Sequence, residues 1–285
     1  MYREALLLFI IFVVSILMRL YFGFYRPTGD LEFYTSLEYT QLTLFGFQKE
    51  FLFYPLYVFD SIEMRIMALA VVLALTNILA LVRLLRRSGQ HVTILVLLIA
   101  VSNWYFAQID MHLARQQLSI YLFILCVTQS RLSLWTFVLC AFSVLYHEIA
   151  LLLFGGWLIA WILTKLHLNF VQRLLRFGAI AVIPLLYLQS SFTGVIFLFY
   201  TMLGFLIVKK ETSCVPLGDA ISIMIMMVLV LNMIGFLSFV NFTRTIGVLV
   251  SVSLFRLMFD GQFQLRDWRL KVPALLGTLL LYGVA

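Results

Sequence analysis

The sequence predicts an all-α protein, a polytopic integral membrane bundle of about nine to eleven transmembrane helices. Of its 285 residues, 64% are hydrophobic and only 12% are charged, and the mean hydropathy is +1.06. Globular proteins are about 45–50% apolar, so a soluble fold could not cover this much apolar surface. Apolar runs long enough to cross a bilayer recur along the chain. We therefore expect one integral membrane domain over residues 1–285.

The individual helices are predicted from these apolar runs. A span needs about 20 apolar residues, and fewer where the helix is short or broken. No small-residue cleavage site follows the first run, so we interpret that run as a retained helix rather than a signal peptide. The expected spans are 5–24, 66–84, 92–109, 117–129, 132–147, 149–164, 177–190, 194–208, 217–240, 244–259 and 272–285.

The charges orient this bundle with its N-terminus in the cytoplasm, because cytoplasmic loops are rich in Lys and Arg. In that orientation the cytoplasmic side holds 14 of the 20 basic residues: Arg3, Arg83, Arg86, Arg87, Arg131, Lys165, Arg173, Arg176, Lys209, Lys210, Arg256, Arg266, Arg269 and Lys271. The opposite side holds eight of the 13 acidic residues: Asp30, Glu32, Glu38, Glu50, Asp60, Glu63, Asp110 and Glu148. The net charge of +7 thus reflects topology, and we expect no nucleic-acid partner.

Two segments between the spans have a composition of their own. Residues 25–64 form a long external loop rich in Tyr, Phe, Leu and Glu, and we expect amphipathic helices there that lie at the membrane surface. Residues 165–176 form a basic amphipathic stretch, which we interpret as a cytoplasmic anchor to anionic lipid. Asp219, which follows Pro216 and Gly218, is expected to cap the start of a helix on the cytoplasmic side.

Small residues and cysteines have structural interpretations. The pair Gly155-Gly156 is expected to allow close packing between two helices. The three cysteines Cys126, Cys140 and Cys214 are scattered, and their spacing predicts neither a disulfide framework nor a metal site.

Unusual polar residues gather on the external side of the predicted bundle. They comprise the run from Asp110 to Gln117, the pair His147-Glu148, Asp30, and Arg244. A charged group at the bilayer centre costs at least about 2.5–3.5 kcal/mol, so such residues usually serve a function. If residues 110–128 are helical, His112, Arg115, Gln116 and Ser119 share one face, and Cys140, Ser143 and His147 form a similar stripe. We expect both faces to point into the bundle or a water-filled cavity.

These residue types suit a diphosphate-bearing, lipid-linked substrate with a hydroxyl acceptor. Arg115 and Arg244 offer planar guanidinium forks that match phosphate oxygens. His147 is our first candidate for the base that activates a hydroxyl, followed by Asp30 and then Glu148. Gln116 and Gln117 are candidates for binding sugar hydroxyls, and a metal site is not expected.

Structural alternatives stay open for each of these residues. Arg115 is also placed to pair with Asp110 at a helix end, and Arg244 to extend toward the membrane surface. His147 is equally suited to a structural hydrogen bond. Asp30, beside Gly29, is also suited to cap a helix.

Several short motifs resemble the EpsG-like branch of the Wzy polysaccharide polymerases. The run Met-His112-Leu-Ala-Arg115-Gln116-Gln117, the segment Gln129-Ser-Arg131 and the run Ala141-Phe-Ser-Val-Leu-Tyr-His147 reproduce its pattern: an Arg at a helix start, a short span, a basic turn and a span that ends in His. Gly29-Asp30 with Tyr34 matches a further element that follows the first helix. The resemblance covers about residues 1–155. Glu148, where the family carries a small or hydroxyl residue, departs from it.

The resemblance implies a metal-independent membrane glycosyltransferase with an outward-facing cavity and no cofactor. It would sit in a bacterial inner membrane with a periplasmic active site, and it would transfer a growing glycan from undecaprenyl diphosphate onto a lipid-linked repeat unit. The implied partners are the undecaprenyl-diphosphate-linked donor and acceptor, membrane lipid and a chain-length regulator protein. His112 and Tyr34 join the expected substrate-binding residues.

Two other functions remain open at this point. An O-antigen ligase, or another membrane glycosyltransferase that uses a lipid-linked donor, would need the same arginines. A transporter of lipid-linked oligosaccharide is favoured less, because the sequence shows no internal repeat and its polar groups cluster at one face.

Overall fold

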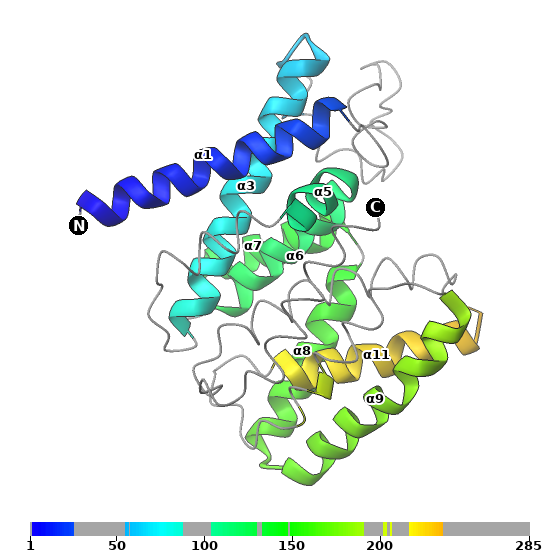
Figure 1. Ribbon diagram of the computed structural model, residues 1–285. Coiled ribbons are helices and arrows are strands. Elements are labelled where there is room, and N and C mark those ends of the chain that lie inside the picture. Colours follow the sequence, from blue (N-terminus) through cyan, green and yellow to red (C-terminus); the bar gives the residue numbers. More distant parts are fainter. Residues whose placement is uncertain are drawn as a thin grey trace. The chain divides into compact units, whose positions relative to one another are not determined.

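A computed structural model describes residues 2–25, 55–56, 58–87, 104–129, 133–147, 149–190, 202–203, 206 and 217–235. Within these ranges the chain is all-helical, with no β-strand, which confirms the predicted all-α class (Figure 1). The helices are α1 (Tyr2–Tyr25), α3 (Ile62–Arg87), α5 (Trp104–His112), α6 (Ala114–Val127), α7 (Leu134–Tyr146), α8 (Ile149–Lys165), α9 (Asn169–Ser190) and α11 (Leu217–Met233). They belong to two compact units, one of residues 1–84 and 92–150 and one of residues 85–91 and 151–285.

Two of the described helices are long and apolar enough to cross a membrane. The apolar stretches are Leu8–Tyr25 in α1 and Ile62–Arg83 in α3, while α6, α7, α8 and α11 are apolar but shorter. Soluble cores and signal sequences contain one or two such helices as well, so the bundle of nine to eleven spans stays a prediction. The expected spans 92–109, 194–208, 244–259 and 272–285 fall mostly or wholly outside the described residues.

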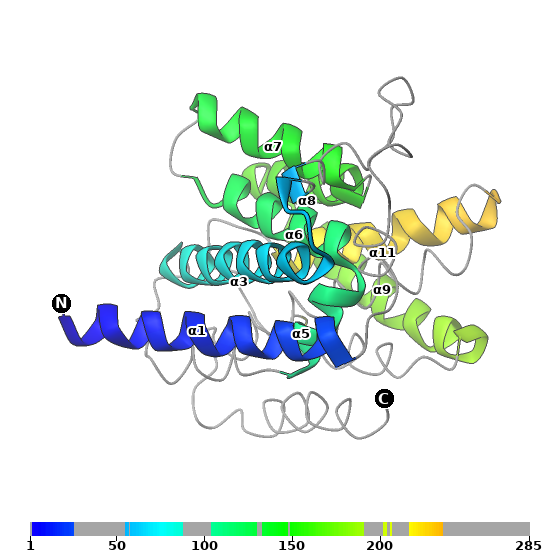
Figure 2. The same ribbon diagram turned by 90° about the horizontal axis from the view of Figure 1, so that it is seen from above.

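The core of the first unit lies where α1, α3, α5 and α6 meet. Its fully buried apolar side chains include Phe22 from α1, Leu73 from α3, Met111 from α5 and Leu118 from α6. A smaller contact, centred on Ile11 and Ile78, joins α1 to α3 (Figure 2). Helix α5 contacts both α1 and α6.

A break at Leu113 separates α5 from α6. The backbone of Leu113 has φ −125° and ψ 49°, outside the helical region, and its apolar side chain cannot cap the helix that follows. The Gln117 amide restores helical bonding by donating to the Leu113 carbonyl oxygen at 3.0 Å. The condition for the shared face, one continuous helix over residues 110–128, is therefore not met, because His112 ends one helix and Arg115 lies in the first turn of the next.

Helices α6 and α7 form an antiparallel hairpin. Ser119 Oγ donates to the Ser143 carbonyl oxygen at 2.8 Å, and Ser143 Oγ donates to the Ser119 carbonyl oxygen at the same distance. Toward the other end of the hairpin, Cys126 Sγ donates to the Thr136 carbonyl oxygen at 3.4 Å. This pairing fixes the register, so the start of α6 lies beside the end of α7.

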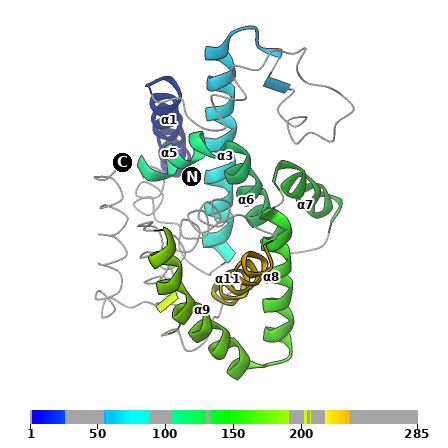
Figure 3. The same cartoon turned by 90° about the vertical axis from the view of Figure 1, so that its right-hand side faces the viewer.

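The second unit contains α9, α11 and nearly all of α8, with α11 lying between the other two (Figure 3). A Cβ added to Gly156 would come within 2.9 Å of the Ala220 carbonyl oxygen, so α8 and α11 approach more closely there than a side chain would allow. This confirms the predicted packing role for Gly156. Gly155 has more room, since a Cβ there would lie 3.8 Å from the nearest atom, Met227 Cε.

The turn between α8 and α9 ends α8 with a left-handed residue. His167 has φ 53°, the only positive value among the described non-glycine residues. Its amide donates to the Thr164 carbonyl oxygen at 3.2 Å, and the Leu168 amide donates to the Leu163 carbonyl oxygen at 3.0 Å. This pair of bonds defines a Schellman motif, in which glycine is the preferred residue at the left-handed position.

A buried ion pair joins α9 to α11. Arg176 Nε donates to Asp219 Oδ1 at 2.5 Å, and both side chains are buried. The interpretation of 165–176 as a surface anchor therefore fails for Arg176, which lies inside one continuous helix, Asn169–Ser190. Asp219 does lie in the first turn of α11, but its carboxylate pairs with an arginine from another helix.

Candidate functional site

A buried ion pair forms the polar centre of the first unit. Arg19 from α1 is 2% exposed and Asp110 from α5 is fully buried. Arg19 Nε donates to Asp110 Oδ2 at 2.8 Å, and Nη2 donates to the same oxygen. Arg19 Nη1 also donates to the carbonyl oxygen of Ser15 at 3.1 Å and to its hydroxyl. The open alternative that Asp110 pairs with Arg115 is therefore wrong for the described residues, because its carboxylate binds Arg19.

The network continues from Asp110 into α6 and α3. Tyr121 donates its hydroxyl proton to Asp110 Oδ1 at 2.5 Å, and Asn77 Nδ2 donates to the Tyr121 hydroxyl at 2.7 Å. Four helices thus share one set of hydrogen bonds around a single carboxylate. Because Asp110 precedes the break at Leu113 and Tyr121 follows it, the network holds α5 and α6 in a fixed relation. The position of Arg115, on the first turn of α6, follows from that relation.

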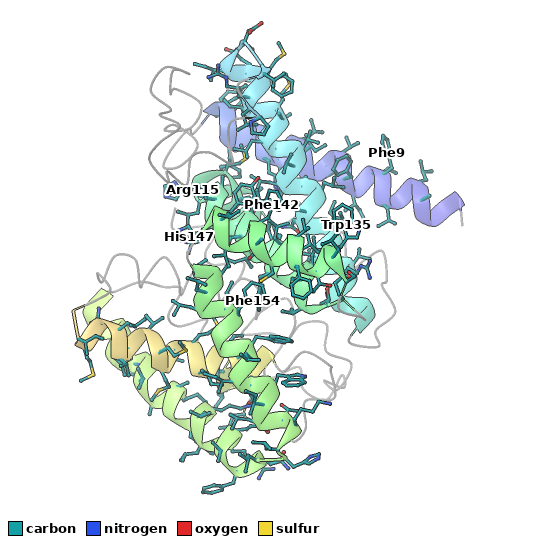
Figure 4. The ribbon with its side chains drawn as sticks, turned by 180° about the vertical axis from the view of Figure 1, so that it is seen from behind. Phe9, Arg115, Trp135, Phe142, His147 and Phe154 are labelled. Atoms are coloured by element: carbon teal, nitrogen blue, oxygen red, sulfur yellow. The ribbon has the colours of Figure 1, made fainter. Side chains whose placement is uncertain are left out.

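The hairpin brings Arg115 and His147 to the same end of the first unit. Ser119, one turn after Arg115 on the same face of α6, has its Oγ 3.4 Å from the His147 carbonyl oxygen. Figure 4 labels Arg115 and His147 near each other, with Trp135 at the opposite end of α7. Both side chains are half-buried. The first turns of α6, which carry Arg115, therefore lie beside the end of α7, which is followed by His147.

His147 joins two helices. It caps the C-terminus of α7 in an extended conformation, with φ −158° and ψ 135°, and its amide donates to the Ser143 carbonyl oxygen at 3.3 Å. Its ring Nδ1 accepts a hydrogen bond from the Ile149 backbone N–H at 3.1 Å, at the first residue of α8. The structural hydrogen bond that the sequence left open for His147 is thus present.

The two glutamines and His112 lie differently from Arg115. Gln116 is 3% exposed and Gln117 is 1% exposed, so both amides are turned into the protein. Among the described residues nothing accepts a hydrogen bond from Gln117 Nε2. His112 is exposed at the end of α5, on the other side of the helix break. The shared face predicted for His112 and Arg115 therefore does not form.

Four of the predicted site residues fall in parts of the chain that the structure does not describe: Asp30, Tyr34, Glu148 and Arg244. Their expected roles in catalysis and binding stay predictions. In the described ranges no group of three or more His, Cys, Asp or Glu side chains is arranged to hold a metal ion.

Arg115 lies in the first turn of α6, at the N-terminal end of that helix. The first backbone N–H groups of a helix carry partial positive charge, which favours a negative ligand. Arg115 adds a full positive charge within that first turn. Comparison of the chain with known protein families, with curated proteins and with solved structures found no match.

Sequence reasoning missed the Arg19–Asp110–Tyr121–Asn77 network. The signal was present, since an arginine inside the first apolar run requires a buried partner. Hydropathy alone does not choose that partner, because Asp110 is 91 residues away along the chain. Tyr121 and Asn77 gave less signal, since single polar residues of these types are common in apolar helices.

Proposed function

We propose that this chain is a polytopic enzyme of the bacterial inner membrane, a polysaccharide polymerase that acts on lipid-linked diphosphates at the periplasmic face. The observation that carries the proposal is the α6–α7 hairpin, which sets Arg115 and His147 at one end of a polar stripe in a very apolar chain. The motif resemblance supplies the substrate class. Large side chains of α1 and α3 support the membrane setting, because Phe9, Leu17, Val71 and Leu75 are exposed.

Arg115 would bind the diphosphate of the donor. It stands at the start of a helix that follows a break, the arrangement by which discontinuous membrane helices direct their positive ends at anionic groups. A guanidinium group presents a planar fork that can bind two phosphate oxygens at once. Charge that develops on the leaving diphosphate is then stabilised without reorganisation of the site.

The reaction would exchange one bond for another at the anomeric carbon of the glycan. The bond from that carbon to the diphosphate oxygen breaks, and the hydroxyl oxygen of the acceptor sugar forms the new glycosidic bond. The proton of that hydroxyl passes to a base, and undecaprenyl diphosphate leaves with the electron pair. Asp30, Glu148 and His147 are the base candidates that the sequence provides.

A test in cells compares three variants with the wild-type chain. Arg115→Ala should shorten or abolish long-chain polymer, with at least about 100-fold less product, which is the loss typical of removing one charge-stabilising donor. Arg115→Lys should make an amount of long-chain polymer between those of Arg115→Ala and the wild type, because lysine keeps the charge and loses the planar fork. Arg173→Ala removes an exposed arginine in α9 and serves as the matched control, with normal polymer expected.

The outcome separates the proposal from its nearest alternative. Long-chain polymer persisting in the Arg115→Ala strain, at normal levels of folded protein, would contradict it. Normal polymer combined with loss of glycan transfer to lipid A would instead identify a ligase. Both readouts come from the same cells by gel analysis of extracted glycans.

A further inference from the structure

The hydrogen bond that His147 accepts determines which of its ring nitrogens carries a proton. A backbone N–H can only donate, so Nδ1, which accepts from Ile149 at 3.1 Å, has no hydrogen of its own. A neutral imidazole has one protonated and one unprotonated nitrogen. The proton of neutral His147 therefore resides on Nε2, and that nitrogen is a hydrogen-bond donor.

The helix that begins at Ile149 favours this tautomer for two reasons. The first N–H groups of α8 need acceptors from outside the helix, and His147 Nδ1 supplies one. A proton on Nδ1 would face the Ile149 N–H and the positive end of the helix, which repels it. A neutral imidazole held at a helix N-terminus in this way acts as a donor to developing negative charge.

We propose that His147 donates a hydrogen bond from Nε2–H to the diphosphate, alongside Arg115, and is not the base that takes the acceptor proton. This inference rests on the proposed function and changes the role of one residue within it. As the bond to the sugar breaks, negative charge on the leaving diphosphate is shared between the Arg115 guanidinium and the Nε2–H group. The acceptor proton then passes to a carboxylate, for which Asp30 and Glu148 are the candidates.

The tautomer is measured directly on the full-length chain in detergent micelles. Nitrogen-15 NMR of labelled histidine separates protonated from unprotonated ring nitrogens, and the chain contains only four histidines. The His147 signals are assigned by their absence from the His147→Gln spectrum. We expect a proton on Nε2 and none on Nδ1. A proton on Nδ1 would overturn the inference whatever the chain catalyses.

Two substitutions separate the roles of the ring nitrogens in the reaction. His147→Gln places an amide N–H near the position of Nε2, and His147→Asn places an acceptor oxygen near the position of Nδ1. A donor role predicts that polymerisation with His147→Gln stays within about 10-fold of wild type. It also predicts that His147→Asn and His147→Ala fall by about 100-fold or more, the loss typical of one such donor.

The variants also distinguish failure of this inference from failure of the proposed function. Equal loss of activity in His147→Gln and His147→Ala, with both folded by circular dichroism, would overturn the donor role while leaving the polymerase intact. Normal polymerisation in every variant, including Arg115→Ala, would overturn the proposed polymerase. Binding is tested by adding undecaprenyl diphosphate, which should shift the Nε2 signal of the wild-type chain. If the ligand saturates the wild-type chain, fails to bind Arg115→Ala, and leaves the Nε2 signal unshifted, the donor role is contradicted.

Discussion

Removing one member of the Arg19–Asp110 pair should destabilise the chain far more than removing both. Asp110→Asn leaves the Arg19 guanidinium buried without a counter-charge, and Arg19→Met leaves the Asp110 carboxylate buried beside Tyr121. The double variant carries no charge at either of these two positions, and its asparagine still offers an acceptor to the Tyr121 hydroxyl. The comparison therefore isolates the ion pair from the rest of the network.

The magnitude follows from the burial of both groups. Arg19 and Asp110 are 2% and 0% exposed, so neither charge is compensated by solvent when its partner is removed. Breaking a buried pair from one side costs about 3–5 kcal/mol, whereas replacing both partners is often close to neutral. We expect each single variant to lose about 3–5 kcal/mol in free energy of unfolding, and the double variant to lose less than either.

The free energies are measured by equilibrium unfolding of the purified chain in mixed micelles of increasing denaturing detergent. Fluorescence of the five tryptophans follows the transition. Glu63→Gln, an exposed acid in the first turn of α3, is the control and should change stability by less than about 0.5 kcal/mol. Single variants that lose less than about 1 kcal/mol, or a double variant that loses the sum of the two, would refute the reasoning.

Two predictions concern the second unit, and the same unfolding measurement tests both. Gly156→Ala should lower the free energy of unfolding by about 1–3 kcal/mol, because its Cβ would lie 2.9 Å from the Ala220 carbonyl oxygen. Gly155→Ala, with room for a Cβ, should leave stability unchanged or raise it, and equal losses from both would contradict the close approach. His167→Gly should raise the free energy of unfolding by about 0.5–1 kcal/mol, because glycine adopts the left-handed conformation without strain. A decrease would show that the His167 side chain stabilises the turn.

Apolar runs located most of the helices but not their ends. The predicted run 149–164 matches α8 almost residue for residue, whereas the run predicted over 66–84 is a longer helix, Ile62–Arg87, in the structure. Helix α3 extends past its apolar part at both ends because an acid suits the first turn and basic residues suit the last turns. Hydropathy counts those residues as loop, although the helix dipole favours them.

Helix α9 shows the same effect on a larger scale. The basic stretch before residue 177 belongs to the helix, and Arg176 finds a buried partner in Asp219. The break at Leu113 had no local signal, since neither glycine nor proline stands there. Packing of α5 and α6 on their neighbours, which the sequence does not reveal, decides where that helix stops.

The sequence named the candidate residues of the site, but it predicted only part of their arrangement. Periodicity on α7 grouped Ser143 with His147, but the helix ends at Tyr146 and His147 follows it as an extended C-cap. The equivalent reasoning on α6 failed for His112, because it assumed one helix through Leu113. Spacing alone also gave no tautomer for His147, which depends on where α8 begins.

The most direct test of the proposed polymerase is a reaction with purified components. The full-length chain is reconstituted in liposomes with one undecaprenyl-diphosphate-linked oligosaccharide, and the products are analysed by mass spectrometry. The proposal predicts a ladder of products that differ by one repeat unit, together with released undecaprenyl diphosphate, and neither product with Arg115→Ala. Substrate recovered unchanged from the folded wild-type chain, or moved across the bilayer without any new covalent bond, would contradict it.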